Sequence, residues 1–268
     1  MIHLVPTITT PAGACLTRAN WHELNINTVA CALDYLLMKP GLHYLETLAH
    51  IDHYLGDIGD CILDASMLVL NEQKQFIIRS VYDGSRISLS LSRFWALVEQ
   101  LNPYAIVLPP SLTQYELPFL RDVIPVFPFE QVSQRHYPTS YGVYGSEATV
   151  CHQSFEKIKL IYLMYEGVVP SFSVTSCSVP IYIAANQPAQ DAYQGIVYLK
   201  TGPDMITQAV FANQFETLID NCTCPICMQG FTKAYLHHLF QNTPLLCQRL
   251  LIMHNIHTVY TRFQSFVN

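Results

Sequence analysis

Three cysteines within six residues, Cys222, Cys224 and Cys227, constrain this chain more than any other feature of its sequence. The spacing Cys-x-Cys-x2-Cys lets one loop bring three thiolates to a point, and Pro225 stiffens that loop. Three thiolates and one imidazole make a closed tetrahedral ligand set, which suits a structural Zn²⁺. We therefore predict a structural zinc site, in preference to three ordinary thiols in a turn.

The fourth ligand is a histidine in the segment that follows the three cysteines. Residues 233–242 are predicted to form a helix, and Pro244 can begin a second helix that carries His254 back to the metal. Three other histidines lie nearby and remain alternatives: His237, His238 and His257. For His237 and His238 we favour a packing or capping role. Because such a site exists only in the folded chain, metal binding would stabilise the module directly.

Charge divides the chain at the same place. The 268 residues carry 14 basic and 20 acidic side chains, a net charge of −6. Residues 221–268 contain no Asp or Glu and have a formal charge of +3, so residues 1–220 carry −9. We predict a domain over residues 1–220 and a zinc-binding helical module, residues 221–268, packed on it.

Composition also limits the location and the class of protein. No apolar run reaches the roughly 18 residues of a membrane span, so we expect no membrane association. Residues 1–6 lack the positive start of a signal peptide, and nine cysteines are an odd number, so we expect reduced thiols and a cytoplasmic protein. The overall acidity argues against a general nucleic-acid coat but leaves room for a local basic patch.

Short apolar strands alternate with amphipathic stretches before residue 220. We predict a strand leading into a loop over residues 60–70, strands at 76–81 and 104–108, and a helix that begins at Ser90 or Ser92 and ends near Leu101. A similar helix-to-strand step runs from Cys151 to Met164. The Pro-rich stretch 103–138 otherwise predicts an irregular connection. This alternation indicates an α/β fold with parallel strands.

The metal motif closely resembles the C-terminal zinc module of tRNA-guanine transglycosylases, also called queuine tRNA-ribosyltransferases. The resemblance rests on Cys222-Thr223-Cys224-Pro225-Ile226-Cys227, then Lys233-Ala-Tyr-Leu-His-His-Leu-Phe240, then His254-Asn255-Ile256 with Tyr260. It assigns His254 as the fourth ligand, although this chain has one extra residue between Cys227 and Ala234. It implies a (β/α)8 barrel of the TIM type. Because such barrels need about 250 residues and about 220 remain here, we expect a shortened or incomplete barrel.

Weaker similarities to the same family lie upstream. Residues 36–42 resemble a family segment that ends in Arg-Pro-Gly-Leu, and residues 82–85 resemble an Asp-Gly-Ser turn. Ile62-Leu63-Asp64 resembles the strand that leads into the family's Asp-Ser-Gly-Gly loop. Between about residues 105 and 200 the similarity has little specificity.

The family exchanges guanine in tRNA for a 7-deazaguanine base by double displacement. One Asp attacks the ribose C1′, and a second Asp, in the Asp-Ser-Gly-Gly loop, handles protons. The resemblance places Asp64 at the second position, but the glycines of that loop are replaced by Ala65-Ser66-Met67-Leu68. A third Asp, which recognises the base, should lie near Pro110 or Ser111, where this chain has no acid.

The position of the nucleophilic Asp is the largest departure from the family. Where the family reads Asp-Cys-Val-Leu-Pro, this chain reads Ser176-Cys177-Ser178-Val179-Pro180. No Asp or Glu lies between Val168 and Gln190. A serine hydroxyl needs an adjacent general base before it can attack, so Ser176 does not replace a carboxylate.

Three functions follow from this comparison. We favour a transglycosylase-like protein that lacks standard base exchange and acts as a tRNA-binding or noncatalytic partner subunit, paired with a catalytic subunit or with itself in a homodimer. The first alternative is an active, divergent transglycosylase in which Asp64 works with Glu166 or Asp191, and a second carboxylate within about 7 Å of Asp64 would support it. The second alternative is a structural zinc protein with no nucleic-acid role.

Overall fold

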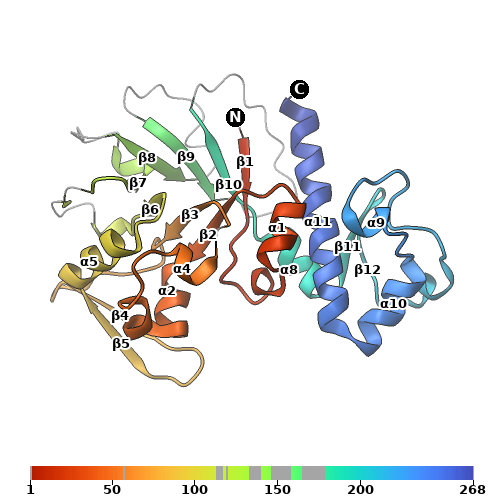
Figure 1. The fold of residues 1–268 in the computed structure, drawn as a ribbon, viewed down its shortest axis with the longest axis horizontal. Helices are drawn as coiled ribbons and strands as arrows, with labels where there is room; N and C mark the ends of the chain where they lie inside the picture. Colours follow the sequence, from red (N-terminus) through yellow and green to blue (C-terminus); the bar gives the residue numbers. More distant parts are fainter. Residues whose placement is uncertain are drawn as a thin grey trace. The chain divides into compact units, whose positions relative to one another are not determined.

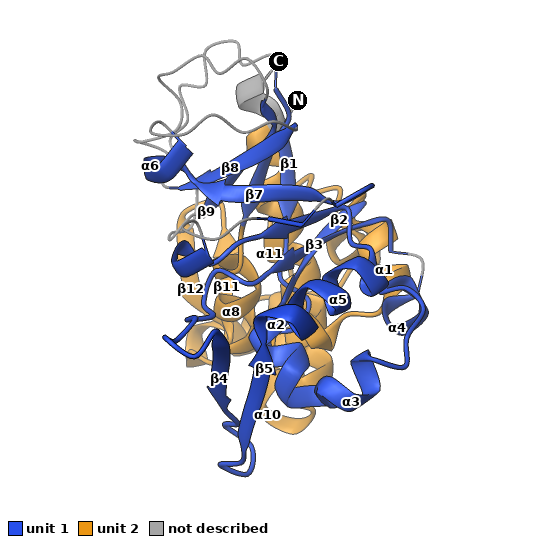
Figure 2. Ribbon diagram, turned by 90° about the vertical axis from the view of Figure 1, so that its left-hand side faces the viewer, with its two compact units in different colours: residues 1–10, 27–165, 173–184 blue, residues 11–26, 166–172, 185–268 orange. Residues whose placement is uncertain are grey.

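The computed structural model describes residues 2–56, 58–112, 117–118, 120–132, 140–145, 158–164 and 179–267. These residues form two compact units, coloured separately in Figure 2. Unit 1 contains residues 1–10, 27–165 and 173–184, and unit 2 contains residues 11–26, 166–172 and 185–268. Several residues singled out in the sequence lie outside the described residues: Cys151, Glu166, Ser176 and Cys177.

Unit 1 is built on an eight-stranded sheet whose neighbouring strands are all parallel (Figure 1). Its strands follow one another in chain order: β1 (Ile2–Val5), β2 (Thr28–Ala32), β3 (Asp60–Asp64), β6 (Ala105–Val107), β7 (Ile124–Pro128), β8 (Tyr141–Gly145), β9 (Ile158–Met164) and β10 (Ile181–Ala184). Strand β1 also pairs with β10, and a parallel bridge between Thr7 and Ala30 joins the β1 side to β2. Two backbone hydrogen bonds of 2.9 Å support this bridge, one from Ala30 to Pro6 and one from Ile8 to Ala30. The predicted TIM-type barrel is confirmed.

The barrel has eight strands, and it is shortened in the segments that connect them. The helical segments of unit 1 are α2 (Leu33–Leu36), η2 (Leu37–Gly41), α3 (Leu42–Leu45), α4 (Asp52–Leu55), α5 (Leu91–Leu101), η3 (Pro110–Leu112) and α6 (Phe129–Val132). Of those crossovers that the structure describes, α5 alone reaches 11 residues. The Ser90 side chain caps α5 by accepting a hydrogen bond from Arg93 N, as its sequence predicts. A hairpin of β4 (Gln75–Arg79) and β5 (Arg86–Ser90) precedes it.

The Pro-rich stretch 103–138 was wrongly expected to be irregular after its first strand. It also contains the barrel strand β7 and the short helix α6. Pro125 and Pro128 are both part of β7, which pairs with β6 on one side and β8 on the other. Proline is rare inside a central strand because it donates no backbone hydrogen bond, so the sequence argued against a strand that the barrel nevertheless contains.

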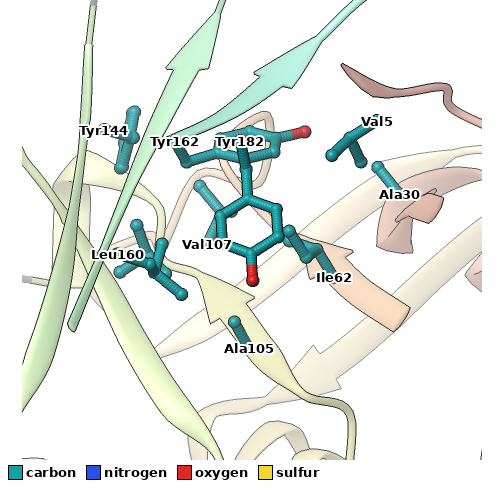
Figure 3. Packing of buried hydrophobic residues seen from close by; sticks show 10 residues of the cluster. Val5, Ala30, Ile62, Ala105, Val107, Tyr144, Leu160, Tyr162 and Tyr182 are labelled. Carbon is teal, nitrogen blue, oxygen red and sulfur yellow. The ribbon is translucent and has the colours of Figure 1, made fainter. Parts of the chain in front are cut away.

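The barrel interior is filled by the side chains of both large and small residues. Ten buried residues form this cluster (Figure 3): Val5, Ala30, Ile62, Ala105, Val107, Val126, Tyr144, Leu160, Tyr162 and Tyr182. The three tyrosines come from the adjacent strands β8, β9 and β10, and the two alanines from β2 and β6. A Cβ atom added at Gly142 would lie 2.8 Å from the Leu160 side chain, so this position must stay small. Such filling is typical of small barrels, whose interior is a packed core.

Unit 2 is mostly helical. Its elements are η1 (Gly13–Cys15), α1 (Arg18–Glu23), α8 (Gln187–Tyr193), β11 (Ile196–Leu199), β12 (Gly202–Met205), η4 (Ala209–Asn213), α9 (Pro225–Met228), α10 (Lys233–Asn242) and α11 (Pro244–Val267). Strands β11 and β12 form an antiparallel pair. The helix predicted over residues 233–242 is confirmed as α10, and Pro244 begins α11 as expected. A separate module beginning at residue 221 within this unit stays a prediction.

No helix among the described residues has the length and hydrophobicity needed to span a bilayer.

Candidate functional site

Unit 2 brings the four predicted metal ligands together. The Sγ atoms of Cys222, Cys224 and Cys227 and a ring nitrogen of His254 all lie within 4.8 Å of one another. Cys224 forms the N-terminal cap of α9, and its sulfur accepts a hydrogen bond from Cys227 N at 3.3 Å. The short helix therefore turns Cys224 and Cys227 toward the same point. Three thiols and an imidazole at this separation could hold one metal ion.

The ring of His254 is held in the orientation that a metal ligand needs. Its Nε2 donates a hydrogen bond of 2.8 Å to the backbone carbonyl of Tyr198. Its Nδ1 lies 3.3 Å from the sulfur of Cys224, and the other two sulfurs lie at 3.6 and 4.0 Å. The carbonyl places the proton of the neutral ring on Nε2, so Nδ1, on the side of the three sulfurs, is the atom available to a metal ion.

The charge of the metal-free site concentrates on one sulfur. Hydrogen bonds from Cys224 and Cys227 hold the pKa of Cys222 far below its usual range, and the same interactions raise the pKa of Cys224. Binding of a metal ion as three thiolates therefore requires protons to leave the site.

Asn255, the neighbour of His254, holds the strand that orients the histidine. Its Oδ1 accepts a hydrogen bond of 2.9 Å from Tyr198 N. Its Nδ2 donates to the carbonyls of Pro188 at 3.2 Å and Ile196 at 2.9 Å. Asn255 is fully buried and fixes β11, whose Tyr198 carbonyl holds His254. The pair His254-Asn255 is visible in the sequence, but only the structure shows that the Asn255 side chain holds β11.

The other histidines of unit 2 have different partners. The Nδ1 of His237 contacts the carbonyl of Ile206 at 2.8 Å, and His237 is buried, in agreement with the predicted packing role. His238 is exposed and contacts Asn242 on its own helix. His257 lies 3.1 Å from the hydroxyl of Thr223.

Asp64 lies at the carboxyl end of β3, which is the end of a TIM barrel that carries active sites. Its Oδ1 accepts a hydrogen bond of 2.9 Å from Ser66 N. Burial raises the pKa of Asp64, and hydrogen bonds from Ser66 offset part of that rise. The Tyr162 hydroxyl is fully buried and acts on Asp64, but it makes no hydrogen bond of good geometry with the described residues. Among the described residues no cation acts on Asp64, so it is a partly buried acid without a cationic partner there.

A second carboxyl group at this end of the barrel, Asp34, was not singled out from the sequence. Ala32, the last residue of β2, pairs in register with Asp64, and Asp34 follows two residues later in the first turn of α2. Burial raises the pKa of Asp34, backbone hydrogen bonds partly offset this, and the charge of Asp64 raises it further. The two acids therefore interact.

Of the two acids proposed as partners of Asp64, Glu166 lies outside the described residues, and its role stays a prediction. Asp191 lies in unit 2, where its Oδ2 accepts a hydrogen bond of 2.7 Å from the Tyr198 hydroxyl and its Oδ1 accepts one from Gln187. Its partners are therefore structural groups of its own unit.

Comparison with known proteins gives a match over the region of the metal ligands. Residues 182–266 match the family model of queuine tRNA-ribosyltransferase. Over this segment the chain is similar to the queuine tRNA-ribosyltransferase family. The resemblance of the metal motif to this family is thereby confirmed.

Individual queuine tRNA-ribosyltransferases match part of their length. The enzyme of Protochlamydia amoebophila is 37% identical over 108 residues, which cover 39% of this chain and 27% of that protein. The enzyme of Thermoanaerobacter sp. is 30% identical over 94 residues, covering 35% and 23%. A queuine tRNA-ribosyltransferase accessory subunit 2 from Gallus gallus is 35% identical over 86 residues, covering 30% and 20%. The matched segments thus span about a quarter of these relatives.

The boundaries of the family match separate the two candidate sites. The four metal ligands lie inside residues 182–266, whereas Asp34, Asp64 and Ser176 lie outside them. Similarity to the queuine tRNA-ribosyltransferase model therefore supports the metal site and does not reach the carboxyl end of β3.

Ser111 has a structural role. It lies where the resemblance to the family implies a base-recognising Asp. Its hydroxyl accepts a hydrogen bond of 3.1 Å from Leu70 N and so joins η3 to the loop after β3. In the same loop Leu68 is buried, while Met67 and Val69 are 77% and 73% exposed. The loop after β3, for which the resemblance to the family implies a glycine-rich loop, contains exposed apolar residues and is joined to η3.

Proposed function

We propose that this chain is a transglycosylase-like protein without standard base exchange, which acts as a tRNA-binding or noncatalytic partner subunit in queuosine-type tRNA modification. One observation carries the proposal. The family's metal-ligand set is complete in residues 222–254, whereas no Asp or Glu lies between Val168 and Gln190, where the family has its nucleophile. The similarity to a relative named as an accessory subunit supports the same function.

The metal at the four-residue site is proposed to be Zn²⁺. Three thiolates and one neutral imidazole are the donors that zinc prefers in closed structural sites, and the orientation of His254 fits this role. With four protein ligands the ion has no open position, so it would supply stability rather than catalysis. The purified chain should contain about one zinc ion, and a cytoplasmic location would keep its thiols reduced.

A partner surface is supported by apolar side chains exposed in unit 2. Six large residues between 210 and 246 are at least 47% exposed: Val210, Phe215, Met228, Tyr235, Leu245 and Leu246. Exposed apolar residues in such number are typical of surfaces that meet another protein. The partner is proposed to be a catalytic queuine tRNA-ribosyltransferase subunit, with a homodimer as the second possibility.

Binding measurements test this proposal. The zinc-loaded chain is titrated with tRNA at several salt concentrations, and it is mixed with a catalytic queuine tRNA-ribosyltransferase on a sizing column. We expect salt-sensitive tRNA binding, a stable complex with the catalytic subunit, or both. If the chain binds neither tRNA nor a subunit and is monomeric, it is a structural zinc protein without a nucleic-acid role.

A second candidate function is an active, divergent transglycosylase, and the pair Asp34 and Asp64 favours it. Two interacting acids at the carboxyl ends of adjacent strands can take different protonation states, as an acid and a base require. One carboxylate would attack the ribose C1′ as guanine leaves with a proton from the other. This function requires that Asp34→Asn and Asp64→Asn each abolish base exchange while the wild-type chain shows it.

A further inference from the structure

The four metal ligands differ in their access to solvent. Cys224 and His254 are 0% exposed and Cys227 is 8% exposed, whereas Cys222 is only half-buried. A cavity of about 310 Å³ lies beside Cys222, and none of the other three ligands lines it. Reagents from solvent can therefore reach one sulfur of the site.

The cavity beside Cys222 has a mixed but mainly positive lining. It is formed by the turn after β11, the loop that carries Cys222, and one face of α11. Lys200 and Arg262 supply two positive charges, and Asp220 supplies one negative charge. Lys200 is exposed and makes no ion pair within the part of the chain that the structure describes. Small anions are therefore favoured over small cations in this cavity.

We propose that Cys222 is a thiol-modification site, at which a small anionic disulfide removes one ligand from the metal centre. The disulfide enters the cavity beside Lys200. The Cys222 thiolate attacks one sulfur of the disulfide, a new S–S bond forms, and the other sulfur leaves as a thiolate that takes a proton from water. Cys222 is oxidised and the leaving half of the reagent is reduced, so electrons balance without another reactant.

Modification at Cys222 changes the metal site in a defined way. A mixed disulfide cannot act as a thiolate ligand, so the ion keeps only Cys224, Cys227 and His254 and exchanges more readily. A reducing thiol reverses the step and restores the ligand. The metal site would then respond to the ratio of disulfide to thiol around the protein.

The test uses the zinc-loaded full chain and three disulfides that differ in charge: anionic glutathione disulfide, neutral 2-hydroxyethyl disulfide and cationic cystamine. Peptide mass spectrometry identifies the modified cysteine, and a chromogenic chelator records released zinc. With glutathione disulfide we expect modification of Cys222 before Cys224 and Cys227, with about one zinc released per modified Cys222. Both readouts should reverse on reduction.

The variant Lys200→Glu tests the cavity without changing a ligand. It should slow release by glutathione disulfide about fivefold, speed release by cystamine by a similar factor, and leave the neutral reagent within twofold. Lys159→Glu, the same charge change at an exposed position of β9, should leave all three rates within twofold. The variant Cys222→Ser should lose the modification if it still folds.

Three results would overturn the proposal: modification of Cys224 or Cys227 before Cys222, retention of zinc after Cys222 is modified, or equal effects of Lys200→Glu and Lys159→Glu. The inference rests on the proposed zinc site. Metal analysis of the untreated chain distinguishes failure of the zinc assignment from failure of the modification proposal. A chain without zinc refutes the metal assignment before any disulfide is added.

Discussion

Buried polar groups around His254 and around Asp64 differ in their hydrogen-bond and charge partners. Near His254, the imidazole has a carbonyl partner, Asn255 makes three hydrogen bonds, and the Tyr198 hydroxyl donates to Asp191. Near Asp64, no cation among the described residues acts on the acid, and the Tyr162 hydroxyl makes no hydrogen bond of good geometry with those residues. The network around His254 lies inside the segment that matches the family model, whereas Asp64 and Tyr162 lie outside it. Similarity to the family model thus covers this network and the four possible metal ligands, and it does not reach the acid at the end of β3.

Removing a metal ligand should have the largest effect. Cys224→Ser removes a fully buried sulfur from the site, so we expect loss of zinc and of the folded structure around it, since structural zinc is worth about 10 kcal/mol or more in small modules. Metal analysis and thermal unfolding followed by circular dichroism measure both. Cys247→Ser is the matched control, because Cys247 is equally buried and donates to Leu236 O but is not a ligand. Retention of zinc by Cys224→Ser would contradict the ligand assignment.

Removing Asn255 should have the next largest effect. Asn255→Ala leaves one buried backbone N–H and two carbonyls without their partners, so we expect the free energy of unfolding to fall by about 3 kcal/mol. Urea unfolding of the zinc-loaded chain measures this. Zinc affinity should fall as well, because β11 orients His254. A loss below 1 kcal/mol would show that these hydrogen bonds do not hold the strand.

Two buried tyrosines should respond differently to the same change. Tyr198→Phe deletes a hydroxyl that donates to Asp191 at 2.7 Å and should cost about 1.5–3 kcal/mol. Tyr162→Phe deletes a buried hydroxyl that makes no hydrogen bond of good geometry with the described residues, so the free energy of unfolding should stay equal or rise by up to about 1 kcal/mol. Urea unfolding at pH 7 compares the pair. Equal losses in both variants would remove the contrast between the two regions.

Asp64 should give the smallest effect, visible as a pH dependence. Burial raises its pKa in the folded protein above the ordinary value of 3.8, so the folded chain binds the proton more tightly than the unfolded chain. Stability therefore falls as pH rises from about 4 through the raised pKa, and Asp64→Asn should remove this fall. The difference in unfolding free energy between variant and wild type should grow from pH 4 to pH 7 in favour of the variant. A constant difference would mean that Asp64 has no raised pKa.

The sequence predicted the parts of the molecule that depend on local spacing. The Cys-x-Cys-x2-Cys loop, the helix 233–242 and the cap at Ser90 each follow from residues close together in the chain. Strand β7 was missed because Pro125 and Pro128 argue against a strand locally, while the barrel supplies its two neighbours.

Asp34, the second carboxyl group at the end of the barrel that carries Asp64, could not be predicted from local spacing. Asp34 has no motif of its own, and its proximity to Asp64 follows from the register of Ala32 opposite Asp64. Register depends on the pairing of β2 with β3, which one strand alone does not encode. That Tyr162 makes no hydrogen bond of good geometry with the described residues likewise becomes visible only when the interior of the barrel is assembled.

The central claim is that the family's metal site persists here without the family's chemistry. Its most direct test is the incorporation of labelled guanine into tRNA by the zinc-loaded chain alone, with a catalytic queuine tRNA-ribosyltransferase as the positive control. The account predicts no incorporation above the level of a reaction without protein, and no change in the Asp64→Asn variant. Sustained incorporation that is lost in Asp64→Asn would contradict it and would establish this chain as an active enzyme.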